Sequence, residues 1–417
     1  MMKEKEMKRV PKLRFPEFTD DWEQRKLGEL YGTIGNAFVG TATPYYVEIG
    51  HFYLESNNVK DGQINHNSEI FINDEFYEKQ KDKWLHTGDM VMVQSGHVGH
   101  AAVIPKELDN TAAHALIMFR NKKEKIEPYF LNYEYQTEKA KKKIENITTG
   151  NTIKHILASD MREFEVDVPK YEEQKVIAGY FRKLDNLITL HQRKLEKLKE
   201  LRKGVMKKLF NQEVRFKADD ESEFPEWEKK KIGDVFSQIK YKNKDGRNQN
   251  VITNSAEFGL INQRDFFDKD IAVDGKTENY TVIKTGDFVY NPRKSKQAPY
   301  GPFNCYKLEE NGIVSPLYTC LRPKSNVNDK YLLWYFKSGS WHRFIYENGA
   351  QNGARHDRVG MTDSLMQEIP VYLPQAVEEQ QKIADCLLSL DDVIAKQKAT
   401  LVAWEELKKG LLQQMFV

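Results

Sequence analysis

A long heptad pattern that occurs twice is the feature that most constrains how this chain folds. From Glu172 to Phe210, apolar residues recur in alternating steps of four and three, which predicts a long helix with a narrow apolar seam. The same pattern returns between Glu378 and Phe416, and matched positions are 206 residues apart throughout. Two copies at one fixed offset indicate a duplicated unit that contains a long helix.

The two predicted seams share their polar interruptions as well as their apolar residues. His191 and Arg202 interrupt the first seam at the positions where Gln397 and Lys408 interrupt the second. The apolar seam residues are Ile177, Phe181, Leu184, Ile188, Leu195 and Leu198 in the first helix, and Ile383, Leu387, Leu390, Ile394, Leu401 and Trp404 in the second.

The repetition extends into the segments that precede the two helices. A Trp-Glu segment opens each copy, at Trp22 and at Trp227, and a Thr-Gly-Asp strand signal follows in both. The sequence therefore predicts four parts, which are a first globular domain over residues 1–168, a central long helix over 169–213, a second globular domain over 214–373 and a C-terminal long helix over 374–417.

Each globular part has the pattern of an α+β domain. Strand-like runs such as "DMVMVQ" and "HALIMFR" in the first copy, and "DFVYNP" and "IVSPLYTCL" in the second, lie next to Gly-Asp turns. One amphipathic helix is predicted to follow in each copy, at residues 128–146 and 330–347. Pro169 and Pro374 stand just ahead of the long helices, where proline is tolerated.

Composition limits the class of protein. The chain of 417 residues is 40% hydrophobic and 30% charged, with a formal net charge of +2, which suits a folded protein of several domains. Lysines and arginines cluster at 139–143, 229–231 and 293–296, as expected for contact with polyanions, although such runs are also common on solvated surfaces. Three isolated cysteines suggest no disulfide framework, and neither a membrane span nor a signal peptide is apparent. We expect a cytoplasmic protein.

The motifs that usually indicate catalysis are incomplete. "GNAFVGTA" has the glycine spacing of a phosphate-binding loop but lacks the lysine that reaches the terminal phosphates. "NPRK" begins like the motif of amino methyltransferases, but Arg293 and Lys294 replace the aromatic cradle for a flipped base. His97, His100 and His114 could ligate zinc, but no acidic or cysteine partner lies at the usual spacing. We expect no catalytic residue, metal or cofactor in this chain.

Polar loops at equivalent places in the two copies are the candidate DNA-binding sites. Arg and Lys suit guanine edges and phosphates, whereas Asn and Gln suit adenine edges, so loops with different polar residues would read different sequences. Two surface loops that drifted apart are the alternative. The candidates are Gln94, Ser95, His97 and His100 in the first copy and Asn291, Arg293, Lys294, Lys296 and Gln297 in the second, with a second loop in each copy that adds Asn151, Lys154 and His155, and Arg355 and His356.

This combination resembles the DNA-specificity subunit of type I restriction-modification enzymes. The likeness covers essentially the whole chain and rests on the W-E-x-x-x-L/I-G-E/D opening, the T-G-D-x-V strand, the E-E-Q start of each long helix and the order domain, helix, domain, helix. It implies two α/β target-recognition domains joined by two long antiparallel α-helices in a coiled coil, with a pseudo-twofold internal repeat.

The resemblance also implies what the chain does. It would be a non-catalytic subunit that recognises a bipartite target in double-stranded DNA and recruits two methyltransferase subunits and the restriction and motor subunits. Those partners, rather than this chain, would use S-adenosylmethionine, ATP and Mg²⁺. Two alternatives stay open at this point, a stand-alone sequence-specific DNA-binding regulator and an enzyme in its own right, such as a nuclease with scattered acidic ligands.

Overall fold

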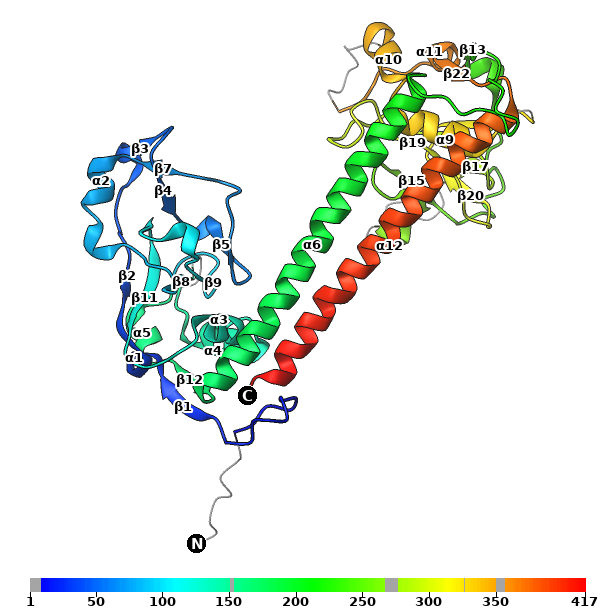
Figure 1. Ribbon diagram of the computed structural model, residues 1–417. Coiled ribbons are helices and arrows are strands. Elements are labelled where there is room, and N and C mark those ends of the chain that lie inside the picture. The colour runs from blue at the N-terminus through cyan, green and yellow to red at the C-terminus, as the bar shows by residue number, and fades with distance from the viewer. Residues whose placement is uncertain (1–8, 151–153, 267–276, 326, 350–356) are drawn as a thin grey trace. The chain divides into compact units, whose positions relative to one another are not determined.

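The structure is a computed structural model, and it describes residues 9–150, 154–266, 277–325, 327–349 and 357–417. The chain divides into unit 1, Met1–Arg193 with Ala399–Val417, and unit 2, Lys194–Lys398. The two long helices, α6 (Tyr171–Phe210) and α12 (Val377–Met415), each contribute one part to unit 1 and one part to unit 2 (Figure 1).

Unit 1 mixes short strands and helices ahead of α6. Its helices are α1 (Leu27–Leu30), α2 (Asp74–Glu78), α3 (Pro128–Glu134), α4 (Glu138–Ile147) and α5 (Ala158–Glu163). Its strands are β1 (Glu23–Lys26), β2 (Tyr31–Asn36), β3 (Tyr46–Val47), β4 (His51–Leu54), β5 (Val59–Lys60), β6 (Gln63–Ile64), β7 (Phe71–Ile72), β8 (Met90–Val93), β9 (Ala101–Val103), β10 (Ala112–Ala113), β11 (Leu116–Lys122) and β12 (Glu165–Val168).

Unit 2 has a similar order of elements, with fewer strands among its described residues. Its helices are α7 (Ile232–Val235), α8 (Gln263–Phe266), α9 (Asp329–Ser338), α10 (His342–Asn348) and α11 (Asp363–Glu368). Its strands are β13 (Glu228–Lys231), β14 (Phe236–Gln238), β15 (Ile252–Ser255), β16 (Gly259–Asn262), β17 (Thr281–Ile283), β18 (Phe288–Tyr290), β19 (Phe303–Cys305), β20 (Gly312–Val314), β21 (Thr319–Pro323) and β22 (Pro370–Leu373).

The central sheets of the two units have the same topology. In unit 1 the strand order is β2-β11-β8-β9, and in unit 2 it is β14-β21-β18-β19, with all neighbours antiparallel. A two-stranded sheet closes each globular part, β1 with β12 and β13 with β22. The α+β class and the internal repeat predicted from the sequence are confirmed.

The single amphipathic helix predicted in each copy is wrong in detail, because both segments are broken into two helices. In unit 1 the break precedes Thr137, whose hydroxyl accepts a hydrogen bond from the backbone N–H of Ala140 and so starts α4 anew. In unit 2 the break lies at Gly339, which adopts a left-handed conformation with φ of 74° after α9.

The run "IVSPLYTCL" also differs from the prediction, since it forms two strands in different sheets. β20 pairs with β17 and ends at Val314, whereas β21 begins at Thr319 and pairs with β14 and β18. Pro316 lies between them, and a proline has no N–H to donate to a strand ladder.

Within unit 1, the first part of α6 packs antiparallel against the last part of α12. Phe181 contacts Phe416 with ring centroids 5.9 Å apart, and Asp185 pairs with Lys408 at 2.7 Å. Further along α6, His191 lies beside Trp404 at 6.3 Å between ring centroids. The partner number falls as the α6 number rises, as an antiparallel pair requires.

Within unit 2, the last part of α6 packs antiparallel against the first part of α12. Phe210 shares a buried cluster with Ile383 and Leu387, and Arg202 forms an ion pair with Asp391. In this pair, as in Asp185–Lys408 of unit 1, the two residue numbers add to 593, so both units use one helix register. The antiparallel helix pair is therefore confirmed.

The predicted seam residues of both helices lie on the inner side of the pair. Ile177, Phe181, Leu184, Ile188 and Leu195 are buried in α6, as are Ile383 and Leu387 in α12. The remaining predicted residues are half-buried, namely Leu198, Leu390, Ile394, Leu401 and Trp404. No helix in the described parts of the chain is long and apolar enough to cross a membrane.

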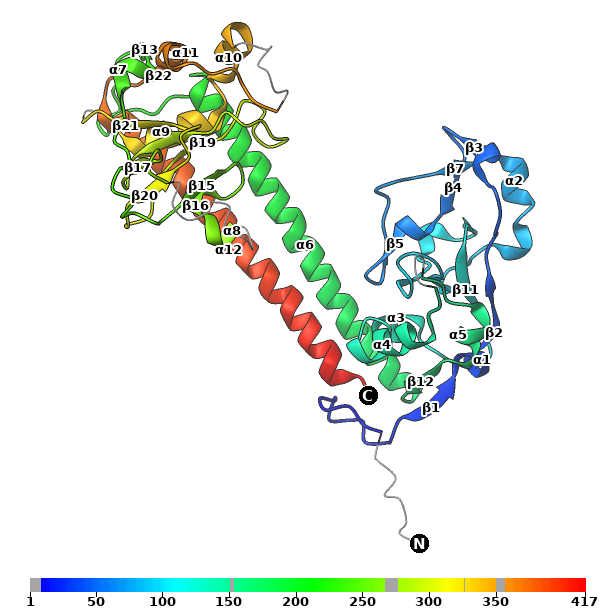
Figure 2. The same ribbon diagram turned by 180° about the vertical axis from the view of Figure 1, so that it is seen from behind.

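The E-E-Q start of α6 anchors the rest of unit 1. Glu173 is buried and accepts two hydrogen bonds from the guanidinium of Arg14, both at 2.7 Å. Gln174 accepts a bond from the backbone N–H of Glu127, the N-cap of α3, at 3.0 Å and donates to the carbonyl of Pro169 at 2.8 Å. The motif thus joins the N-terminal segment, α3 and the start of α6, and Figures 1 and 2 both show α3 beside α6.

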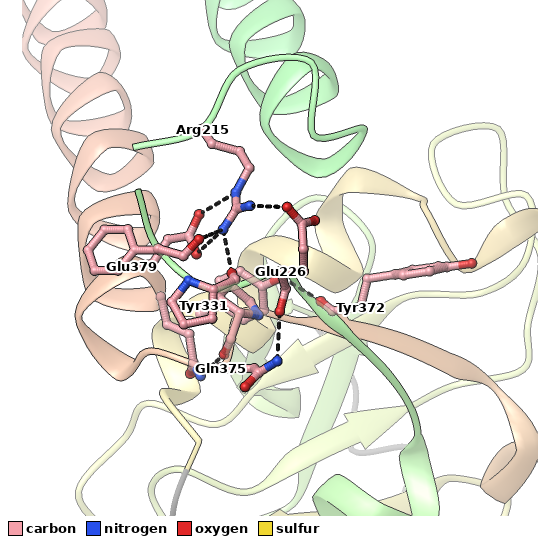
Figure 3. A network of polar contacts seen from close by, with 10 residues as sticks. Arg215, Glu226, Tyr331, Tyr372, Gln375 and Glu379 are labelled. Carbon is pink, nitrogen blue, oxygen red and sulfur yellow. Dashed lines mark hydrogen bonds and ion pairs between the residues drawn. The ribbon is translucent and has the colours of Figure 1, made fainter. Parts of the chain in front are cut away.

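The E-E-Q start of α12 makes the same contacts in unit 2. Glu379 is buried and accepts bonds from Arg215 Nε at 3.1 Å and Nη2 at 3.0 Å (Figure 3). Gln380 accepts from the backbone N–H of Asn328, the N-cap of α9, at 2.9 Å. The segment after α6 therefore has the role in unit 2 that the N-terminal segment has in unit 1.

Candidate nucleic-acid interface

The two loops predicted separately in the first copy lie side by side in unit 1. Ser95 and His155 form an antiparallel backbone bridge. The backbone N–H of Gly96 donates to the carbonyl of Lys154 at 3.1 Å, and the N–H of Ile156 donates to the carbonyl of Gln94 at 3.0 Å. The β8–β9 loop and the segment after α4 therefore form one continuous polar surface.

The second copy uses the same arrangement in unit 2. Arg293 and Arg358 form an antiparallel bridge, and the N–H of Lys294 donates to the carbonyl of Asp357 at 2.8 Å. The N–H of Val359 donates to the carbonyl of Pro292 at 2.8 Å. Three of the predicted residues, Asn151, Arg355 and His356, lie outside the described residues.

The predicted residues of unit 2 differ in how far they reach into solvent. The side chains of Arg293, Lys294, Lys296 and Gln297 are exposed, as contact with DNA requires. Asn291 is half-buried, and its Oδ1 accepts the backbone N–H of Arg293 at 3.0 Å, so it shapes the turn on which Arg293 stands.

The three histidines considered as zinc ligands, His97, His100 and His114, have different environments in unit 1. His97 is exposed, and Lys154 and His155 on the adjoining segment are exposed as well. His100 is half-buried, and its Nδ1 accepts the backbone N–H of Asp61 at 3.2 Å, which leaves Nε2 as the hydrogen-bond donor. Burial lowers the pKa of His100, so the ring is neutral at neutral pH.

His114 does not join the other two histidines. Its Nδ1 lies 3.2 Å from Glu55 Oε1, and its Nε2 lies 3.0 Å from the carbonyl of Gly40. Among the residues that the structure describes, no three His, Cys, Asp or Glu side chains are grouped to hold a metal ion.

Sequence reasoning missed a hairpin beside the first pair of loops. The β5–β6 turn at Asp61 and Gly62 is held by Asn132 of α3, whose Nδ2 donates to the carbonyl of Gly62 at 2.8 Å. Gly62 has φ of 83°, which favours glycine, and a Cβ there would lie 2.2 Å from Gln136 Nε2, so the Gln136 side chain would have to move. A turn signal "KDGQ" was visible in the sequence, but not its distance from the loop at residues 94–100.

A cavity of about 600 Å³ lies between this hairpin, the β8–β9 loop and α4 in unit 1. Its polar lining includes His97, His100, Lys141 and Lys154, together with Lys409 of α12. A smaller cavity of about 290 Å³ lies beside the β15–β16 hairpin and β19 in unit 2. Both cavities lie beside a hairpin, but the one in unit 2 is not lined by the candidate loop at residues 291–297.

Both repeat copies, each with its pair of polar loops, match one known protein family. The family model described as type I restriction modification DNA specificity domain matches residues 19–200 and 225–403. The chain belongs to this family. The two matched stretches correspond to the two repeat copies, each with its globular part and most of its long helix.

Curated relatives of this specificity family agree along the chain. A protein named putative type I restriction enzyme MjaX specificity subunit, from Methanocaldococcus jannaschii, is 26% identical over 96% of this chain and 94% of its own length. The type I restriction enzyme MjaVIII specificity subunit of the same organism is 26% identical over 51% of each chain.

Solved structures of specificity subunits share the fold. The S subunit of a type I restriction-modification system from M. genitalium aligns with a TM-score of 0.57 and 15% identity, over 98% of this chain and 99% of that one. A chain from a study of complex assembly and conformational transition of the type I R-M system aligns with a TM-score of 0.57 and 17% identity, over 96% and 98%.

Proposed function

We propose that this chain reads a bipartite target in double-stranded DNA, one part with each globular domain, and brings the methyltransferase and restriction subunits of its complex to that target. Family membership makes it a DNA specificity subunit, which contributes recognition rather than catalysis. A stand-alone regulator is not favoured, because the family and the curated relatives are named for restriction-modification enzymes.

The observation that supports a two-part target is the pairing of two loops in each repeat. In unit 1 the β8–β9 loop lies against the segment before α5, and in unit 2 the β18–β19 loop lies against the segment before α11. Backbone hydrogen bonds hold each pair, so the exposed side chains stand on a defined base, as base-edge contacts need.

The exposed loop residues differ between the two copies, so the two domains would recognise different DNA sequences. In unit 2, Arg293 and Lys294 are exposed cations suited to guanine edges or phosphates. In unit 1, His97 and Lys154 occupy the comparable surface, and the fixed tautomer of His100 offers a donor at Nε2. We expect the two half-sites to be unrelated in sequence.

The remaining parts of the proposal concern partners, cofactors and location. Two methyltransferase subunits and the restriction and motor subunits would assemble on this chain, and they would use S-adenosylmethionine, ATP and Mg²⁺. This chain would bind none of these cofactors, and the complex would act in the cytoplasm. Purification of the assembled complex, with cofactor content measured for each subunit, tests these points.

Mapping of methylated adenines in cells that express this chain with its partners tests the function directly. We expect one bipartite motif with a fixed unread gap. Arg293→Ala and Lys294→Ala separate the roles of the loop residues. Loss of a base contact should cost about 1 to 3 kcal/mol on the cognate site only, whereas loss of a phosphate contact should weaken binding to all sequences alike. A methylome without a bipartite motif would contradict the proposal.

A further inference from the structure

One buried side chain from outside the central sheet anchors the β18–β19 loop of unit 2, residues 291–302. Asn254 of β15 is 4% exposed. Its Nδ2 donates to the carbonyl of Val289 in β18 at 2.7 Å and to the carbonyl of Pro302, the last loop residue, at 3.3 Å. Because β15 and β16 form a sheet of their own, this amide joins a separate sheet to both ends of the loop.

Two further asparagines bind to Asn254. Its Oδ1 accepts a hydrogen bond from Asn304 Nδ2 at 2.7 Å, and its backbone carbonyl accepts one from Asn291 Nδ2 at 3.3 Å. Asn304 also donates to the carbonyl of Ser255 at 3.1 Å. Both the donor and the acceptor of the Asn254 side chain therefore have partners, as a buried amide requires.

The contacts continue from Asn254 to the exposed part of the loop. Asn291 uses its Nδ2 on Asn254 and its Oδ1 on the backbone N–H of Arg293, at 3.0 Å. Its own backbone N–H donates at 3.0 Å to the carbonyl of Pro302, which Asn254 also contacts. A shift of Asn254 would therefore move the turn that carries Arg293.

The base of the loop is closed tightly, whereas its middle is open to solvent. A Cβ at Gly301, which has φ of 86°, would lie 2.1 Å from the carbonyl oxygen of Asn291, so the two ends of the loop meet backbone to backbone. Tyr290 donates its hydroxyl to the carbonyl of Tyr300 at 2.8 Å. Residues 293–297 are exposed. The direction of the exposed side chains thus depends on how the base is held.

The repeat shows a different solution at the same place in unit 1. The strand registers place Asn291 where unit 1 has Val93, and Asn304 where unit 1 has Ala102. Val93 and Ala102 are buried members of an apolar cluster. The β5–β6 hairpin there meets β9 through a backbone bridge between Gly62 and Ala102. Unit 1 therefore uses apolar and backbone contacts where unit 2 uses asparagine side chains.

The length of the loop gives a physical reason for the difference. The β8–β9 loop spans residues 94–100, whereas the β18–β19 loop spans residues 291–302. A longer loop has more conformations to lose when it is ordered. Apolar contacts are not directional, so they would fill the space beneath the longer loop without orienting it. Hydrogen bonds from a fixed amide have a preferred direction and can do so.

We infer that Asn254 is a positioning residue for DNA recognition, which holds the β18–β19 loop in the conformation from which its exposed side chains read one half of the target. The inference rests on the proposed function, in which this loop contacts bases. Asn254 is buried, so it acts through the loop rather than by contact with DNA. Contacts to base edges need side chains within about 0.5 Å of their productive position, so loss of this anchor should relax recognition of one half-site.

The alternative is that Asn254 only stabilises unit 2, and Asn243 provides the matched control. Asn243 lies in unit 2 and is 2% exposed. Its Oδ1 accepts the backbone N–H of Asn248 at 3.2 Å, and its Nδ2 donates to the carbonyl of Asn248 at 2.9 Å and to Thr277 Oγ1 at 3.4 Å. These bonds hold a different segment, so Asn243→Ala should cost stability without a change in the recognised sequence.

The test compares DNA binding by the complex of this chain with its methyltransferase subunits. The affinity for cognate DNA is measured against DNA with one base changed in either half-site, and exchange of residues 214–373 identifies the half that unit 2 reads. In Asn254→Ala, the ratio of the two affinities should fall by about tenfold or more for that half and stay unchanged for the other. Asn243→Ala should keep both ratios, although both variants lower the temperature of thermal unfolding.

Hydrogen exchange of the complex without DNA measures the loop itself. The backbone N–H groups of Asn291, Ser295 and Gly301 are hydrogen-bonded within the loop. They should exchange faster in Asn254→Ala than in the wild type or in Asn243→Ala.

A second variant covers the case in which Asn254→Ala does not fold. Asn254→Val with Asn304→Ala removes both partners of one buried hydrogen bond and introduces at 304 the residue type that unit 1 has at Ala102. This variant should fold and show the same loss of recognition in the half that unit 2 reads.

Unchanged affinity ratios in both Asn254 variants would overturn the inference. An equal loss in Asn243→Ala would also overturn it, because stability rather than loop position would then explain the effect. If the wild-type complex distinguishes no base in either half-site, the proposed function fails and the inference fails with it. That failure is recognised in the wild type alone, so it is not confused with a failure of the inference.

Discussion

Buried carboxylates are the residues whose charge matters most for the stability of this fold. An arginine pairs with each of Glu173 and Glu379, and these hydrogen bonds raise the pKa of Arg14 and of Arg215. Glu134 in α3 is a different case. It is buried, its Oε2 has no hydrogen-bond partner, and burial raises its pKa to about 8.

Glu134 should make unit 1 less stable as the pH rises. The folded chain holds a proton on this carboxyl up to about pH 8, whereas the unfolded chain releases it near the ordinary value of 4.5. Its stabilising effect is therefore complete below about pH 4.5 and is lost as the pH rises toward 8. In urea unfolding at pH 5 to 8.5, the free energy of unfolding of Glu134→Gln should fall less with pH than that of the wild type. The control Glu200→Gln, at an exposed position, should show the same fall as the wild type. Parallel curves for Glu134→Gln and the wild type would contradict the assignment.

Arg215 should be essential for the fold of unit 2. Arg215→Met leaves the fully buried Glu379 without its charged partner, which typically costs about 3 to 5 kcal/mol of unfolding free energy. Arg14→Met should cost less, because Trp22 Nε1 still lies 3.4 Å from Glu173. Chemical denaturation measures both, and Arg215→Met with Glu379→Leu should recover most of the loss. An equal effect of the two single variants would show that Trp22 does not compensate.

At the scale of elements, two ion pairs define how the long helices align. They are Asp185–Lys408 in unit 1 and Arg202–Asp391 in unit 2, and in each pair the cation is one of the polar interruptions of a seam. A slip of one heptad would place Asp185 opposite Leu401 or Met415, so a carboxylate would lose its partner and face an apolar side chain. The polar interruptions therefore select one register, a role well attested for polar residues in coiled coils.

This register predicts how the helices can be lengthened. Four residues inserted after Lys194 alone add about 6 Å to α6 but cannot leave both ion pairs aligned, because α12 is unchanged. A matching insertion after Lys398, the point opposite in the register, should restore them. If the helices hold two reading domains apart, the doubly inserted protein should keep both half-sites and widen the unread gap by about one or two base pairs of 3.4 Å each. Methylated-site mapping decides, and an active protein with an unaltered gap would show that the helices are not the spacer.

At the scale of the whole molecule, each repeat copy carries its own pair of hydrogen-bonded loops. Unit 1 places its paired loops on residues before α6, and unit 2 places its own on residues before α12. The first globular part also contacts the chain end, since Leu13 N–H donates to the carbonyl of Gln414 at 2.8 Å and Trp22 packs against Phe416. A transplanted domain must therefore keep the residues that meet the helix ends.

Exchange of residues 12–168 for those of a relative, with Arg14 and Trp22 retained, should change one half of the recognised sequence only. The physical reason is that base-edge contacts are local and each copy has its own loops. Methylome mapping of the chimera provides the measurement, and the reciprocal exchange of residues 214–373 serves as its control. A chimera in which both halves change would exclude modular reading.

The sequence by itself determined the duplication, the two long helices and the α+β class. These follow from periodic patterns that repeat over many residues, and a helix of 40 residues leaves many chances to see its period. The start of α6 at Tyr171 agrees with the position of Pro169 just ahead of it, because an α-helix tolerates proline only at its beginning.

Only the tertiary structure decided which distant residues meet. Several contacts join segments that are far apart in the chain. They are the pairing of residue 95 with 155 and of 293 with 358, the closure of the β5–β6 hairpin on α3, and the bonds from Arg14 and Arg215 to buried carboxylates. The breaks at Thr137 and Gly339 depend on one cap or one left-handed residue, which a periodic pattern does not reveal. Long-range contacts have no period in the sequence, since packing against the rest of the fold selects them.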